Sequence, residues 1–284
     1  MNRILIWGIG ETGKRYYKQV KDIKEVVGFL DNDSKTWGGV FDGVPILGNR
    51  SVLAHIDYDE IVIASMTGLN IIKSELLTAG VQESKIVVSP ELNTIVQARI
   101  NFLRDFAKLH KKESDYAVAE GGVFQGEFSK EINKYFPNAR CYLFDTFTGF
   151  DKRDLASESV NKLSDAKDGY FSTTNEKLVW EKILNKDKVE IRKGYFPESA
   201  YGLEKEKFVF VNLDFDLYIP TLEGIKLFYP KLIRKGILLI HDFFNPAYSG
   251  VKKAVEDYEK QENIELLKLP IGDACSIAVM KINC

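Results

Sequence analysis

The stretch at residues 116–145 constrains the fold of this chain more than any other. A first apolar run ends in Glu120 and is followed by three glycines (Gly121, Gly122, Gly126) and then by a helix-like segment. A second apolar run at residues 141–144 follows the helix-like segment and ends in Asp145. A buried strand, a glycine turn, a helix and an acid-tipped strand form the first half of a nucleotide-binding α/β unit. A carboxylate at the second tip can accept hydrogen bonds from both hydroxyls of a ribose. The pattern therefore predicts a nucleotide-like ligand held by Asp145.

The spacing of the later β-rich runs predicts the rest of the sheet. These runs lie at residues 188–192, 207–214, 236–242, 264–269 and 276–282. Helices fit between most neighbouring pairs, but only PIGDAC separates the last two runs, which is too short for a crossover and predicts a hairpin. A mostly parallel seven-stranded sheet that ends in an antiparallel hairpin is the layout of class I methyltransferases. A plain dinucleotide-binding domain would continue with parallel crossovers instead.

The first 89 residues predict a second, smaller Rossmann-like domain of four or five strands. A strand at residues 3–7 precedes a GxGxxG pattern (Gly8, Gly10, Gly13), and a strand at residues 25–30 ends in Asp31, about 20 residues after the glycines. Residues 38–48 look like a loop, because Gly and Pro punctuate them. Two interpretations of the glycines stay open: they lie under a phosphate at a helix N-terminus, or they only allow tight strand–helix packing.

Apolar residues at helical spacing predict a connecting helix at residues 90–113, so that the larger domain spans residues 114–284. The formal net charge of -2 and the pI near 6.1 argue against nucleic acid as a partner. No apolar run approaches the ~20 residues of a membrane span, and the chain begins with a strand instead of a signal peptide. We expect a cytoplasmic protein without membrane insertion; homo-oligomerisation is compatible with the sequence.

The larger domain resembles the macrocin O-methyltransferase family. The resemblance covers residues 114–284 in consistent order and rests on AEGGVFQGEFS, YLFDTFTGF, KGYFPES, VNLDFDLYIPTLEGIKLFYPKL, RKGILLIHDFF and GVKKAVEDY. It implies methylation of sugar hydroxyls by S-adenosylmethionine. The implied donor site comprises Asp145 at the ribose, three residues on the methionine and ribose side, and an aromatic residue beside the adenine or the acceptor (Glu120, Gly122, Gly126, Phe147). The alternative for Glu120 is a cap on the helix that follows.

The first domain resembles the N-terminal sugar-nucleotide-binding domain of bacterial sugar acyltransferases. The residues that carry this resemblance are ILIWGIGETGK, VVGFLDND and GVPILG. It implies a nucleotide site at the glycines and the acid that follows the second strand (Gly8, Gly10, Gly13, Asp31).

Two acidic strand ends of the larger domain supply candidate catalytic groups. Asp214 and Asp216 follow one strand, and His241 and Asp242 follow the next, so they should meet at one edge of the sheet. The resemblance implies a divalent ion, usually magnesium, held by an acid after the fourth strand and two acids after the fifth. Here the pair after the fifth strand is His241 and Asp242, and imidazole suits magnesium poorly. Three interpretations stay open: a metal site at Asp214, His241 and Asp242, a metal-free base at His241 oriented by Asp214 or Asp242, or a structural role.

Residues 151–175 are polar and aperiodic, which predicts either a lid closing on Tyr170 and Phe171 or a solvated insertion. The sequence as a whole predicts an S-adenosylmethionine-dependent O-methyltransferase acting on a sugar or nucleotide-linked sugar hydroxyl in surface-polysaccharide or glycoside biosynthesis. Two rival functions use the same features: an NAD-dependent oxidoreductase or epimerase built on residues 1–89, and a non-catalytic nucleotide-binding protein.

Overall fold

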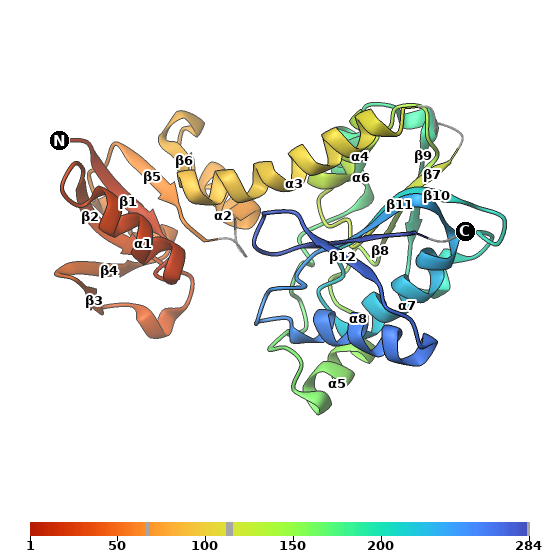
Figure 1. Cartoon of the computed structure of the whole chain (residues 1–284). Coiled ribbons are helices and arrows are strands. Elements are labelled where there is room, and N and C mark those ends of the chain that lie inside the picture. The colour runs from red at the N-terminus through yellow and green to blue at the C-terminus, as the bar shows by residue number, and fades with distance from the viewer. Residues whose placement is uncertain (66–68, 112–115, 283–284) are drawn as a thin grey trace. The chain divides into compact units, whose positions relative to one another are not determined.

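The computed structural model describes residues 1–65, 69–111 and 116–282 (Figure 1). The predicted end of the connecting helix at residue 113, the predicted start of the larger domain at 114 and the chain end at 283–284 lie outside these residues. The chain divides into two compact units, Met1–Val96 and Gln97–Cys284.

The first unit is a six-stranded sheet in the order β3-β4-β2-β1-β5-β6, in which every pair except β3–β4 is parallel. Helices α1 (Glu11–Val20) and α2 (Leu69–Thr78) accompany it, and its strands are β1 (Arg3–Trp7), β2 (Glu25–Leu30), β3 (Val40–Phe41), β4 (Val44–Gly48), β5 (Glu60–Ile63) and β6 (Ile86–Val88). The prediction of a loop at residues 38–48 is wrong, because β3 and β4 form a hairpin there. Ile46 of β4 is buried in the core and pairs with Phe29 of β2.

The second unit is the predicted seven-stranded sheet with its terminal hairpin. Its order is β12-β13-β11-β10-β7-β8-β9; β13 is antiparallel to both neighbours, and the other pairs are parallel. The strands are β7 (Ala117–Gly121), β8 (Cys141–Asp145), β9 (Val189–Lys193), β10 (Phe208–Leu213), β11 (Leu232–Ile240), β12 (Leu267–Pro270) and β13 (Ile277–Met280). The fold class predicted from the sequence is confirmed.

Helices cover both faces of this second sheet. The helices from residue 90 onward are α3 (Pro90–Leu109), α4 (Glu127–Tyr135), α5 (Lys152–Asn161), α6 (Glu176–Lys182), α7 (Tyr218–Phe228) and α8 (Ser249–Glu262). Apolar residues of α7 and α8 pack on one face, and those of α4, α6 and the C-terminal half of α3 pack on the other. All six residues of β10 are buried, as expected for a central parallel strand covered on both faces.

Helix α5 corrects the prediction that residues 151–175 lack regular structure. The side chain of Asp151 caps it by accepting a hydrogen bond from the Arg153 backbone N–H at 2.9 Å. Glu158 of α5 is buried and accepts a hydrogen bond from the backbone N–H of Tyr218, the first residue of α7, at 2.8 Å. The segment is therefore attached to the sheet-covering helices.

Candidate active site

Asp145, the last residue of β8, organises the turn that follows β7. One carboxylate oxygen of Asp145 accepts hydrogen bonds from the backbone N–H groups of Val123 and Phe124, both at 2.8 Å. Its other oxygen accepts one from Phe147 N at 2.7 Å. Burial raises the pKa of Asp145, although these three backbone donors act in the opposite direction. Each carboxylate oxygen has two lone pairs, so acceptor capacity for a ribose hydroxyl remains.

The glycines of this turn are required by close backbone approach. A Cβ on Gly122, which has φ +81°, would lie 1.9 Å from the backbone oxygen of Asp214. Gly126 has φ +80° and is the residue before α4, where only glycine is unstrained. The side chain of Phe147, which the sequence analysis placed beside the adenine or the acceptor, is 5% exposed and packs in the core.

Glu120 lies in β7 inside a network of polar side chains, 1% exposed. The Asn212 amide donates to one of its oxygens at 3.0 Å, and the hydroxyl of Ser129 donates to the other. Burial raises the pKa of Glu120 to about 8, against the effect of Ser129 and the positive charge of Arg99. Glu120 therefore does not act as the cap of α4. It links β7 to the neighbouring β10 through Asn212.

Asp214, His241 and Asp242 meet at the ends of β10 and β11, as adjacency of the parallel strands predicted. His241 Nδ1 lies 2.7 Å from Asp242 Oδ2 and 3.0 Å from Asp214 Oδ1. Burial alone would lower the pKa of His241, but the charge of Asp214 and the hydrogen bonds to both carboxylates raise it well above its usual value. The two carboxylates therefore favour the protonated form of the ring.

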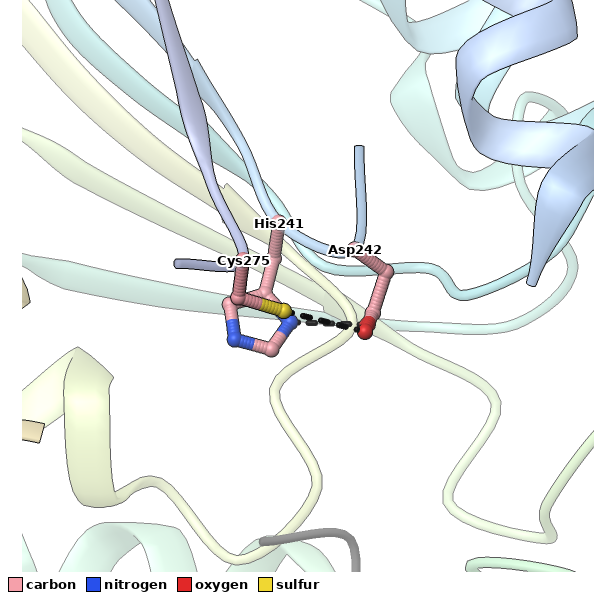
Figure 2. A group of neighbouring side chains, drawn as sticks. All are labelled: His241, Asp242 and Cys275. Atoms are coloured by element: carbon pink, nitrogen blue, oxygen red, sulfur yellow. Dashed lines mark hydrogen bonds and ion pairs between the residues drawn. The ribbon is translucent and has the colours of Figure 1, made fainter. Parts of the chain in front are cut away.

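Two more side chains complete this group. The Cys275 thiol, from the turn between β12 and β13, lies 3.3 Å from Asp242 Oδ1 (Figure 2). Burial and the charges of Asp242 and Asp214 raise the pKa of Asp216 well above its usual value. One ligand atom from each of Asp214, Asp216, His241 and Asp242 lies within 4.8 Å of the others, and the same holds for His241, Asp242 and Cys275.

The donor atoms of this group suit magnesium poorly. Asp214 Oδ1 contacts His241 Nδ1, and Asp214 Oδ2 accepts a hydrogen bond from Arg99 Nη2 at 2.8 Å, so both oxygens already face cations. The neighbouring donors include an imidazole and a thiol, whereas Mg²⁺ prefers carboxylate oxygens and waters in octahedral geometry. The magnesium prediction stays a prediction, and the chemistry proposed below is carried by protein groups.

The segment predicted as a lid contacts the glycine turn after β7. The ring of Phe171 packs edge-on against Phe124 at 5.4 Å. The Gln125 side chain donates to the backbone oxygen of Thr173 at 2.8 Å, and the Thr174 hydroxyl donates to the backbone oxygen of Phe124. Tyr170 is 46% exposed. The segment therefore borders the turn, and closure on Tyr170 and Phe171 stays a prediction.

In the first unit, Asp31 plays the structural role that Asp145 plays in the second. Its Oδ2 accepts a hydrogen bond from the backbone of Ile9 at 2.9 Å. A Cβ on Gly13 would lie 1.8 Å from the Gly8 backbone oxygen, which shows that tight packing requires this glycine. A Cβ on Gly10, the residue before α1, would meet no atom within 4 Å. The open position at a helix N-terminus is the feature that suits a phosphate.

Sequence reasoning missed Arg99 and Asn212, and it did not place Cys275 at the site. Asn212 carried a signal, since it is a polar residue within the apolar run KFVFVNLD. Arg99 carried none, because a charged residue in an amphipathic helix is ordinarily assigned to the solvent face.

Within the described part of the chain, no helix is long and apolar enough to cross a membrane.

Comparisons with known proteins identify the family of each part. Residues 1–87 match the C2185-like N-terminal family, and residues 91–277, more than half of the chain, match the macrocin-O-methyltransferase (TylF) family. No curated protein matches the chain.

One solved structure shows the same fold at low sequence identity, and a second is similar over a larger share of the chain. The O-methyltransferase NovP is 17% identical with a TM-score of 0.53, covering 66% of this chain and 80% of NovP. CalS11, the calicheamicin methyltransferase, is 15% identical with a TM-score of 0.49, covering 81% and 88%. By the family match over residues 91–277, the chain belongs to the macrocin-O-methyltransferase family and is an S-adenosylmethionine-dependent O-methyltransferase.

Proposed function

We propose that this enzyme methylates a hydroxyl of a nucleotide-linked sugar, in the biosynthesis of a surface polysaccharide or a glycoside. The observation that carries the proposal is the position of His241, whose Nδ1 is held by Asp242 at 2.7 Å and Asp214 at 3.0 Å. A sugar hydroxyl is a poor nucleophile until it loses its proton, and an oriented imidazole is the group that most often accepts such a proton.

The donor site is formed by the tips of β8 and β7. S-adenosylmethionine supplies a methyl group on a sulfonium, which an oxygen nucleophile can displace. Asp145 Oδ1 accepts a hydrogen bond from a ribose hydroxyl, while the contacts of Oδ2 to Val123 and Phe124 fix the turn. Gly122 lets this turn pack against the backbone of Asp214, since a side chain there would collide with it. These groups position the donor, and positioning is the larger part of catalysis in a displacement of this kind.

The acceptor site is formed by the tips of β10 and β11. With Nδ1 engaged by two carboxylates, the other ring nitrogen of His241 is the one that takes the hydroxyl proton. Asp214 and Asp242 orient the ring and stabilise the imidazolium that results, because each carboxylate is a charge-assisted acceptor. The high pKa of His241 makes it a strong base once neutral. The reaction should therefore accelerate as the pH rises through that pKa.

The first unit is proposed to bind the nucleotide of the acceptor. Support comes from the open Gly10 position at the start of α1 and from Asp31 at the tip of β2. A phosphate at a helix N-terminus is stabilised by free backbone N–H groups and by the helix dipole.

The methyl-transfer test incubates the enzyme with S-adenosylmethionine and a panel of UDP- and dTDP-linked sugars, and detects methylated product by mass spectrometry. We expect His241→Asn to lower kcat by about 10²–10⁴-fold, the usual contribution of a general base. His55→Asn is the matched control, because His55 is exposed and lies in the first unit. A panel without any methylated product would overturn the choice of acceptor. Equal rates for His241→Asn and wild type would overturn the role of the base.

The nucleotide test is calorimetric titration of the full chain with UDP and dTDP. Gly10→Leu should weaken binding about tenfold or more, because a side chain would stand where the phosphate lies. The melting temperature should change little, since a Cβ at Gly10 meets no protein atom within 4 Å. Unchanged nucleotide affinity in this variant would exclude the site at α1.

A further inference from the structure

Arg99 of α3 is a buried cation whose hydrogen-bonding capacity is only partly used. Its side chain is 13% exposed, and its guanidinium lies 4.0 Å from the centre of the Phe128 ring. One terminal nitrogen, Nη2, donates to Asn212 Oδ1 at 2.9 Å and to Asp214 Oδ2 at 2.8 Å. The Nε–H is buried and has no hydrogen-bond partner among the residues that the structure describes.

A buried N–H of a charged group without a partner costs free energy. Such groups are few in native proteins, and each one requires an explanation. A ligand acceptor that arrives only on binding is one explanation. The ligand should be anionic, because a guanidinium forms its strongest hydrogen bonds with carboxylates and phosphates.

The surroundings of Arg99 show why a carboxylate ligand would need it. The negative charge of Asp214 raises the pKa of Arg99 against the effect of burial, and the charge of Asp273 adds to it. An incoming carboxylate would be repelled by these acids unless a cation meets it. Arg99 is placed to do this, while the other cation of the group, His241, has its Nδ1 between two carboxylates.

We infer that Arg99 binds the carboxylate of the methionine part of the donor. The inference rests on the proposed donor site, in which Asp145 at the tip of β8 holds the ribose. The sheet order β8-β7-β10 places Asn212 and Asp214, the partners of Arg99, two strands from Asp145. With neighbouring strands about 4.8 Å apart, this is a step of roughly 10 Å. A methionine chain that leaves the ribose along the strand tips would end beside Arg99.

The same residue would also couple the two halves of the reaction. Nη2 of Arg99 holds Asp214, which contacts Nδ1 of His241 at 3.0 Å. Asn212, the other Nη2 partner, donates to Glu120. A bound carboxylate would therefore fix the guanidinium that in turn fixes the carboxylate beside the proposed base.

The competing explanation is that Arg99 is only a structural ion pair with Asp214. Two ligands separate the explanations: S-adenosylhomocysteine, and 5′-(3-aminopropylthio)-5′-deoxyadenosine, which keeps the nucleoside, the sulfur and the amino group but lacks the carboxylate. Affinities of both are measured by calorimetry with wild type, Arg99→Met and Arg99→Lys. Arg104→Met is the matched control, since Arg104 lies on the same helix and pairs with Asp105.

We expect Arg99→Met to weaken S-adenosylhomocysteine about 10- to 100-fold, the effect of losing charge-assisted hydrogen bonds, and the ligand without a carboxylate less than about threefold. Arg99→Lys keeps a charge opposite Asp214 and guards against a folding defect; it should weaken S-adenosylhomocysteine alone, by a smaller factor. Equal weakening of both ligands, or of neither, would overturn the inference while leaving the proposed function intact. Wild-type protein that binds neither ligand would overturn the proposed donor site, and this inference with it.

Discussion

Replacement of Glu120 by Gln should make the second unit more stable at alkaline pH. Glu120 is buried, and burial raises its pKa from 4.5 to about 8. Gln has the same shape, and its amide can still accept from Asn212 while the Ser129 hydroxyl turns to accept from the new N–H group. The substitution therefore removes an ionisable group and keeps the network.

The sign and size of the effect follow from proton linkage. In the unfolded chain Glu120 ionises near pH 4.5, but in the folded protein it stays neutral until about pH 8. Its contribution to stability is fully present below pH 4.5 and is lost as the pH rises through 8. At 1.36 kcal/mol per pKa unit, the loss approaches about 4–5 kcal/mol. Wild type and Glu120→Gln should thus differ little at pH 5 and by several kcal/mol near pH 8.

Native-state hydrogen exchange measures this quantity for the second unit alone. Peptides that cover β7 and β10 report its global opening, because the slowest amides of a buried sheet exchange through complete unfolding. The free energy of unfolding of wild type should fall between pH 5 and pH 8 relative to that of Glu120→Gln. If the difference between the two proteins is the same at both pH values, Glu120 is ionised in the folded protein and the reasoning about its burial is wrong.

Other expectations concern the inserted helix and the catalytic group. Glu158→Ala should leave the backbone N–H of Tyr218 unpaired and cost about 1–3 kcal/mol; limited proteolysis should then cut residues 151–175 faster, and unchanged cleavage would contradict the anchoring role. The logarithm of kcat in wild type should rise with pH until His241 has lost its proton, because only the neutral ring can accept the hydroxyl proton. The rise should extend above the usual pH range of a histidine, since the charge of Asp214 outweighs burial and raises the pKa of His241. A flat profile would contradict the role of His241 as the base. Prior treatment with EDTA should change kcat less than about twofold, since both oxygens of Asp214 already face cations, and a loss restored by Mg²⁺ would show that a metal takes part.

The sequence predicted the parts of the site that follow from strand periodicity. Apolar runs that end in Asp145 and Asp214 placed both acids at one edge of a parallel sheet, and the short PIGDAC connection predicted the β12–β13 hairpin. The pairing of His241 with Asp214 followed from the adjacency of β10 and β11. These features are local in the sequence, or become neighbours through the parallel pairing alone.

Some features that were not predicted depend on tertiary contacts. Others lie in segments whose amino-acid composition favours a different structure from the one observed. Residues 38–48 contain Gly and Pro, which favour loops, but Pro45 lies in β4 without breaking it, and Ile46 is buried. Helix α5 is polar, so its sequence shows no helical repeat of apolar residues by which it could be recognised. Asp151, immediately before its first residue, was a usable capping signal. The inward position of Arg99 depends on its partners in β10, which are more than a hundred residues away in the chain.

The most direct test of the account is a calorimetric titration of the full chain with S-adenosylhomocysteine, run beside a titration with NAD. Binding of one S-adenosylhomocysteine per chain, weakened at least tenfold by Asp145→Asn and not displaced by NAD, is the result expected if Asp145 holds the ribose of a sulfonium donor. No heat with S-adenosylhomocysteine, together with NAD binding that Gly10→Leu abolishes, would contradict it.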